Sequence, residues 1–125
     1  EGSDIASPDD LVGKTVGVQL GTTGDIYAGD IEDATVERYN KGNEAVQALL
    51  QDKVDAVMID SQPANVFVEQ NEGIYVIDEA FTYEEYAIAV AKEDTELLEE
   101  INAAIAKLEE SGELQAIIDK YIAAE

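Results

Sequence analysis

The sequence predicts a three-layer α/β domain in which helices cover both faces of a mostly parallel sheet. Short apolar segments alternate with amphipathic segments, in the order β-α-β-α-β-α-β-β-α-α. Residues 54–60 (VDAVMID) are nearly continuously apolar, which is typical of a parallel strand covered on both faces. The length of 125 residues fits one domain. We therefore expect a polar leader over residues 1–9 and one domain over residues 10–125.

The first three strands are expected at residues 15–20, 35–39 and 54–60, the second of them as an edge strand. A short helix is expected after the first strand, from about Gly24 and Asp25. A second, capped by Asn43, is predicted across residues 40–53, and a third begins at Ser61 with Pro63 in its first turn. We expect the first and third strands to be neighbours, which places the residues after both at one edge of the sheet.

Two further strands are expected at residues 74–77 and 86–91. Only residues 78–85 join them, which is too short for a parallel crossover, so the fifth strand is predicted to be antiparallel. The predicted strand order is 2-1-3-5-4, in a Rossmann-like or flavodoxin-like sheet. Two helices with Leu and Ile stripes follow, separated by Gly112. We expect them to pack on this sheet or on a partner's.

Composition narrows the function. Asp and Glu number 29 against 7 Lys and Arg, a net charge of −22, which makes nucleic acid and anionic membranes poor partners. The acidity fits a solvated surface, attraction of cationic ligands, or adaptation to high salt. The sequence holds no Cys and no His, so neither a metal site nor a cofactor is expected. No apolar run is long enough to span a membrane, and EGSDIASPDD lacks the features of a signal peptide.

Two features at the predicted sheet edge indicate a small ligand. Gly21, Thr22, Thr23 and Gly24 would present backbone N–H groups at a helix start, where an anion is favoured. Asp60 follows an apolar strand and would offer a fixed carboxylate to a cation. The alternatives are a plain turn capped by a threonine and an aspartate that caps the next helix. Together, the two features match the two charges of a zwitterionic amino acid.

Three stretches carry a resemblance: DLVGKTVGVQLGTTGDIYA, NEAVQALLQDKVDAVMIDSQPANVFVEQN and EEYAIAVAKEDTELLEEINAAIAKLEESGELQAIIDKYI. They resemble the solute-binding proteins of polar amino acid ABC transporters (type II periplasmic binding proteins, family 3). The likeness covers residues 10–122 and implies a single lobe, the second, plus the C-terminal helices. It implies a small polar amino acid as ligand and, for full-length relatives, an ABC permease partner and a periplasmic or extracellular location.

The resemblance also implies roles for individual residues. Thr23 would meet the ligand carboxylate through its backbone N–H and hydroxyl, beside Gly21. Thr22 and Gln19 would line the same wall, and Asp60 would accept the α-ammonium group. The family's first lobe supplies an Arg and aromatic residues that this chain lacks, so the chain carries half a site. We therefore expect weak binding by an isolated lobe, or a homodimer that stands in for the missing lobe.

In the family, the segment that resembles residues 86–91 belongs to the first lobe, and so do the two helices that follow it. In this chain, residues 86–91 are expected to replace the strand that the second lobe would otherwise receive. Three alternatives stand beside the binding lobe: a scaffold lobe without ligand, a dehydratase-like enzyme using Asp60, Glu84 and Glu85, and a receiver domain suggested by MIDSQP. A receiver domain would need acidic residues at the end of its first strand, and this chain has none there. We expect a binding protein and no catalytic residue.

Overall fold

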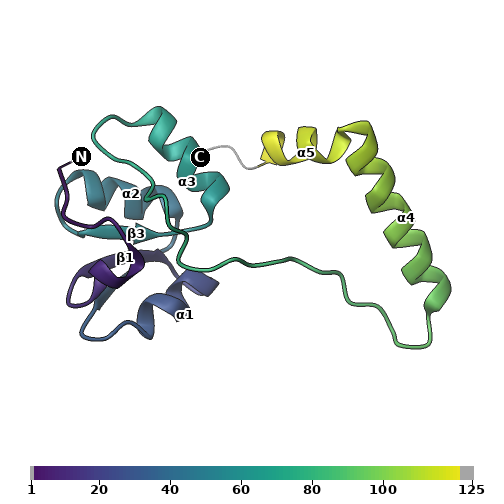
Figure 1. Cartoon of the computed structure of the whole chain (residues 1–125), viewed down its shortest axis with the longest axis horizontal. Helices are drawn as coiled ribbons and strands as arrows, with labels where there is room; N and C mark the ends of the chain where they lie inside the picture. Colours follow the sequence, from purple (N-terminus) through teal and green to yellow (C-terminus); the bar gives the residue numbers. More distant parts are fainter. Residues whose placement is uncertain (1, 122–125) are drawn as a thin grey trace. The chain divides into compact units, whose positions relative to one another are not determined.

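The structure is a computed structural model that describes residues 2–121. The chain divides after Thr82 into two compact units. We call residues 2–82 unit 1 and residues 83–121 unit 2. Unit 1 holds the sheet and three of the five α-helices found in the described residues, and unit 2 holds the other two (Figure 1).

Unit 1 is built on a three-stranded parallel sheet. Its strands are β1 (Thr15–Gln19), β2 (Thr35–Tyr39) and β3 (Ala56–Met58), in the order β2-β1-β3. Val16 of β1 lies opposite Val36 of β2 and Ala56 of β3. The predicted neighbourhood of the first and third strands is therefore confirmed, as is the edge position of the second. The mixed α/β class with a parallel sheet is confirmed as well.

Helices lie on both faces of this sheet. α1 (Thr23–Gly29) lies on one face and α2 (Gly42–Leu50) on the other, with α3 (Ser61–Gln70) on the side of α2 (Figure 1). A short 3₁₀ helix, Pro8–Leu11, precedes β1. Val16 and Val18 are fully buried on the α1 side together with Ile5, Leu11 and Ala28. The expected leader region thus contributes Ile5 to the core.

The opposite face of β1 depends on a glycine. A Cβ at Gly17 would lie 3.3 Å from Val54 and 3.5 Å from Ala45 of α2. The absence of a side chain therefore lets α2 approach the sheet closely, and Ala45, Val46 and Ala48 form its buried stripe.

The start of α2 differs from the prediction. Its N-cap is Lys41, and the Glu44 carboxylate accepts hydrogen bonds from the backbone N–H groups of Asn40 (3.1 Å) and Lys41 (3.2 Å). The prediction that Asn43 caps the helix is wrong, because the helix already includes Asn43. Glu44, three residues after Lys41, makes the contact typical of a capping box.

The fourth and fifth predicted strands are not formed in the described part of the chain. Residues 74–77 and 86–91 have no strand pairing, so the order 2-1-3-5-4 is found only as far as β2-β1-β3. Within residues 74–77, the Tyr75 hydroxyl donates a hydrogen bond to the Ile5 carbonyl of the N-terminal segment (2.6 Å). β3 is only three residues long and half-buried, so it offers a short edge for pairing. An alternating apolar pattern indicates that a segment can form a strand. It does not specify the neighbouring strand with which that segment would pair.

Unit 2 contains α4 (Thr95–Ser111) and α5 (Glu113–Tyr121). Asp94 caps α4 by accepting a hydrogen bond from Leu97 N–H (3.2 Å), and Gly112 ends it with φ +76°. Both helices lie where they were predicted. No described residue of either helix is buried, so their predicted packing against a sheet stays a prediction. No helix between residues 2 and 121 combines the length and apolarity needed to cross a bilayer.

Candidate functional site

The three parallel strands end at one edge of unit 1. Gln19 ends β1 opposite Tyr39 of β2, and Met58 ends β3. We call residues 19–25, 38–42 and 58–61 the carboxyl edge. A Cβ at Gly24 would lie only 3.1 Å from the Met58 carbonyl oxygen, so the start of α1 packs directly against the end of β3. The predicted turn and the segment that leads into Asp60 therefore meet at this edge, as expected for a sheet of this type.

The Gly-Thr-Thr-Gly turn is organised by its own side chains. Gly21 has φ +78°, a conformation that glycine adopts without strain. The Thr22 hydroxyl donates to the Gln19 carbonyl (2.8 Å) and accepts from Asp25 N–H (3.3 Å), so Thr22 is the N-cap of α1. The capping alternative for this turn is therefore correct for Thr22. Thr23, the first residue of α1, is solvent-exposed.

Asp60 lies at the N-cap position of α3. Its carbonyl accepts a hydrogen bond from Ala64 N–H (3.1 Å), whereas its carboxylate makes no capping bond to the helix. The residue is exposed at the carboxyl edge. The alternative prediction, that Asp60 caps α3, is therefore correct for its position at the start of the helix. Its side chain makes no capping hydrogen bond.

Gln19 is half-buried, as is Thr22. Its amide Nε2 donates to the Asn40 carbonyl at 3.5 Å, a long bond. Its Oε1 would be 3.9 Å from a Cβ at Gly42, where α2 begins. Gln19 therefore spans the gap between the ends of β1 and β2, on the side of the turn that faces α2.

Two charged residues at this edge were missed in the sequence. The Asp25 carboxylate accepts from Gly21 N–H through Oδ2 (3.0 Å) and from Arg38 Nε through Oδ1 (2.8 Å). Asp25 is three residues after the threonine that caps α1, the spacing of a capping box, and this signal was available. Arg38 could not be predicted as a neighbour of Asp25 from the sequence, because its position depends on the β1–β2 register, which places it opposite Val18. The Gly21 N–H that was predicted to face a ligand is already bonded to Asp25.

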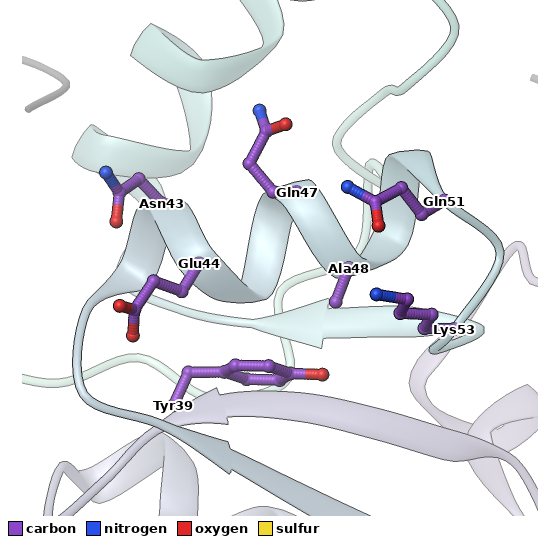
Figure 2. A pocket seen from close by; sticks show the side chains of 7 residues that line it. All are labelled: Tyr39, Asn43, Glu44, Gln47, Ala48, Gln51 and Lys53. Carbon is purple, nitrogen blue, oxygen red and sulfur yellow. The ribbon is translucent and has the colours of Figure 1, made fainter.

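A separate open hollow lies over the end of β2, beneath α2 (Figure 2). Its volume is about 260 Å³, and it is lined by Tyr39, Asn43, Glu44, Gln47, Ala48, Gln51 and Lys53. The Tyr39 ring lies below the helix in Figure 2. None of the five predicted site residues lines this hollow, and its carboxylate, Glu44, is bonded to the backbone at the start of α2. Within residues 2–121, no cluster of carboxylates is arranged to hold a metal.

Comparison with known proteins identifies the family. Residues 34–124 match the bacterial extracellular solute-binding proteins, family 3. The chain belongs to this family of solute-binding proteins. The L-cystine-binding protein TcyJ of Escherichia coli K12 is 33% identical over 97% of this chain and 46% of its own length. The L-arginine-binding protein of Pseudomonas aeruginosa is 36% identical over 97% of this chain and 51% of its own length.

Solved structures of solute-binding proteins confirm the fold. An amino acid ABC transporter substrate-binding protein of Streptococcus pneumoniae, AbpA, solved with L-arginine, is 32% identical with a TM-score of 0.77, over 96% of this chain and 52% of its own. Domain 2 of the T. maritima protein TmArgBP, solved alone, is 40% identical with a TM-score of 0.58, over 64% of this chain and 88% of its own. The chain thus spans about half the length of the curated relatives it matches, and it is a partial lobe of a solute-binding protein.

Proposed function

We propose that the carboxyl edge of unit 1 is half of an amino-acid binding site. The observation that carries this proposal is the contact between Gly24 and the end of β3, which gathers the turn and the segment bearing Asp60 at one edge. In this proposal Thr23 meets the ligand carboxylate beside Gly21, Thr22 and Gln19 line the wall, and Asp60 accepts the α-ammonium group. The names of two relatives, a cystine-binding and an arginine-binding protein, support an amino acid as ligand.

The strength of binding follows from the half-site. Every contact supplied by a second lobe is missing, and an exposed carboxylate attracts an ammonium group weakly in water. We expect dissociation constants of about 1 mM or weaker for unit 1 alone. The side-chain preference would be set mainly by groups that are not in this lobe.

Asp60 provides the test. Asp60→Asn keeps the shape of the side chain and removes its charge, so it should abolish measurable binding of a small neutral amino acid such as L-glutamine. The matched control is Asp30→Asn, which removes the same charge at the exposed C-cap of α1. Affinities would be measured by NMR titration of each variant. Equal binding by Asp60→Asn and Asp30→Asn would refute the role of Asp60, and no binding by the unmodified chain would leave a scaffold lobe without ligand.

We further propose that two copies associate, each supplying a lobe to the clamp. The support is the apolar surface of unit 2, where Leu97, Leu98 and Ile117 are each more than 40% exposed. Covering the exposed part of each of these side chains would contribute roughly 0.6–1.3 kcal/mol. In the assembled protein, residues 10–125 would then act as one lobe.

Sedimentation velocity tests this association. The chain should run at twice its 13.5 kDa mass at high concentration, and Leu97→Glu should keep it monomeric. Val12→Glu, at a side chain of unit 1 that is 51% exposed, should leave the dimer intact. A monomer at all concentrations, or equal effects of the two variants, would contradict the proposal.

The remaining parts of the function follow the family. Its members are solute-binding proteins, so we propose that this chain binds and delivers a ligand and catalyses no reaction. We propose a periplasmic or extracellular location, where a permease of an amino acid ABC transporter would receive the ligand. Assay of the full transporter with and without this chain would test delivery, and uptake that does not depend on the chain would contradict it.

A further inference from the structure

Arg38 is the only arginine in a sequence with 29 acidic residues. It lies on β2 one residue before Tyr39, whose register partner is Gln19 at the end of β1. The β1–β2 pairing therefore carries the one guanidinium of the chain to the carboxyl edge. Its side chain is 48% exposed, so it remains accessible to a ligand.

A single carboxylate ties this arginine to the turn. Asp25 accepts from Arg38 Nε with Oδ1 (2.8 Å) and from Gly21 N–H with Oδ2 (3.0 Å), and its side chain is only 12% exposed. The two oxygens of one carboxylate are covalently fixed relative to each other. The guanidinium is therefore held beside Gly21, with only the width of that carboxylate between the two donors.

The two terminal nitrogens of the Arg38 guanidinium are left to bind a ligand. Arginine has five N–H donors in a planar fork, and the two terminal nitrogens can bind a carboxylate in a bidentate manner. Among the described residues, Nε is the only nitrogen of Arg38 with a hydrogen-bond partner. The four N–H bonds of the terminal nitrogens are therefore available to a ligand.

The turn itself has fewer donors than its sequence suggests. Gly21 N–H donates to Asp25, the Thr22 hydroxyl donates to the Gln19 carbonyl, and Thr22 N–H points to the same carbonyl (3.4 Å). A ligand carboxylate also enters the field of a chain with a net charge of −22. A positive charge at this edge would offset part of that repulsion.

We propose that Arg38 is a binding residue for the carboxylate of the amino acid, and that Asp25 is the positioning residue that holds its guanidinium beside the turn. This inference rests on the proposed amino-acid site and adds a cation that this lobe supplies itself. The ligand class is then an α-amino acid with a free carboxylate, and the corresponding amide should bind less well.

The test compares two variants that each lose one positive charge. Arg38→Gln removes the proposed contact, whereas Lys14→Gln removes a lysine that pairs with Asp4 before the start of β1. NMR titration with L-arginine should show about tenfold or greater weakening for Arg38→Gln and less than about twofold for Lys14→Gln. Equal affinities of the two variants would overturn the role of Arg38. No binding by the unmodified chain would instead overturn the amino-acid site.

L-Argininamide sharpens the test because it lacks the carboxylate and carries one more positive charge. Attraction by the acidic surface alone would make it bind more tightly than L-arginine. A carboxylate contact with Arg38 predicts weaker binding of the amide to the unmodified chain, and that discrimination should shrink in Arg38→Gln. Tighter binding of the amide to the unmodified chain would overturn the proposal.

Arg38→Lys keeps the test informative if Arg38→Gln does not fold. It retains the charge and removes the planar fork, so L-arginine should bind several-fold more weakly than to the unmodified chain. Asp25→Asn should weaken binding in the same direction, because it loosens the guanidinium without removing it. Unchanged affinity in both variants would contradict the proposed arrangement.

Discussion

Unit 1 and unit 2 both carry amphipathic helices, and they differ in what those helices cover. In unit 1, α1 and α2 lie on opposite faces of the sheet, and Val16 and Val18 of β1 are fully buried there. In unit 2, α4 and α5 bury no described residue. An amphipathic pattern in this sequence is therefore enough to form a helix, but it does not by itself place that helix in a hydrophobic core. Unit 1 holds both a core and the candidate site, whereas unit 2 holds neither in the described residues.

The largest expected effect comes from separating the two units. A fragment of residues 1–82 should fold and unfold cooperatively, because it contains the buried hydrophobic residues of the described chain and the related domain 2 was solved alone. A fragment of residues 83–125 should lose most of its helix signal, since helices of 17 and 9 residues without burial are marginal in water. Circular dichroism melts of both fragments measure this. Cooperative melting of the C-terminal fragment would contradict the comparison.

A matched pair of core and surface substitutions gives the next largest effect. Val18→Ala removes buried methyl groups and leaves a cavity, so it should cost about 2 kcal/mol of unfolding free energy. Leu97→Ala, at a side chain that is 41% exposed, should cost less than about 0.5 kcal/mol in dilute solution. Urea unfolding of both variants provides the measurement. Similar costs would mean that α4 is buried in solution.

Salt should stabilise the chain, with a smaller effect than loss of the core. The net charge of −22 makes the compact state repel itself, and about 1 M salt shortens the Debye length to roughly 3 Å. The melting temperature should rise by about 4–8 °C for each kcal/mol that screening restores. Melts in NaCl from low to high concentration test this. A constant melting temperature would show that the charges are too well solvated to matter.

The smallest expected effect concerns Asp10 before β1. Its carboxylate accepts from Ala6 N–H (3.0 Å) and from the backbone and hydroxyl of Ser7, and these bonds, the one from Ala6 first, hold its pKa below the ordinary 3.8. A lowered folded-state pKa stabilises the protein above pH 3.8, and the stability is lost as pH falls through the folded pKa.

Asp10→Asn should therefore be slightly less stable than the unmodified chain at neutral pH, and the difference should shrink in acid below that window. Asp9→Asn is the control, because Asp9 is its neighbour in the same 3₁₀ helix. Unfolding free energies measured across pH would show the narrowing gap. A gap that stays constant into acid would mean that ionisation of Asp10 is not coupled to folding.

Local patterns predicted much of unit 1. The strand at 35–39 was predicted at its observed bounds, and the helices after β1 and β3 begin within two residues of their predicted starts. These elements depend on periodicity and caps that are local in sequence. The strands predicted at 74–77 and 86–91 are not formed in the described residues. A strand needs a neighbouring strand to pair with, and the pattern of one segment does not identify that neighbour.

The site shows the same division. The turn and Asp60 could be placed at one edge from the order of strands alone, and the structure brings their segments together. The Asp25–Arg38 pair joins α1 to β2 across 13 positions and depends on strand register, which no local pattern of charges specifies. Sequence reasoning therefore found the turn at the carboxyl edge and missed the ion pair that organises it.

The most direct test of the account is where chemical shifts move when an amino acid is titrated into the chain. The half-site predicts that amide signals of Gly21 to Asp25 and of residues 60–61 shift together at millimolar L-arginine, while the amides of α4 and α5 shift little at a concentration where the chain is monomeric. Shifts confined to unit 2, or none at the Gly21 to Asp25 amides at tens of millimolar ligand, would contradict the claim that the carboxyl edge of unit 1 binds an amino acid.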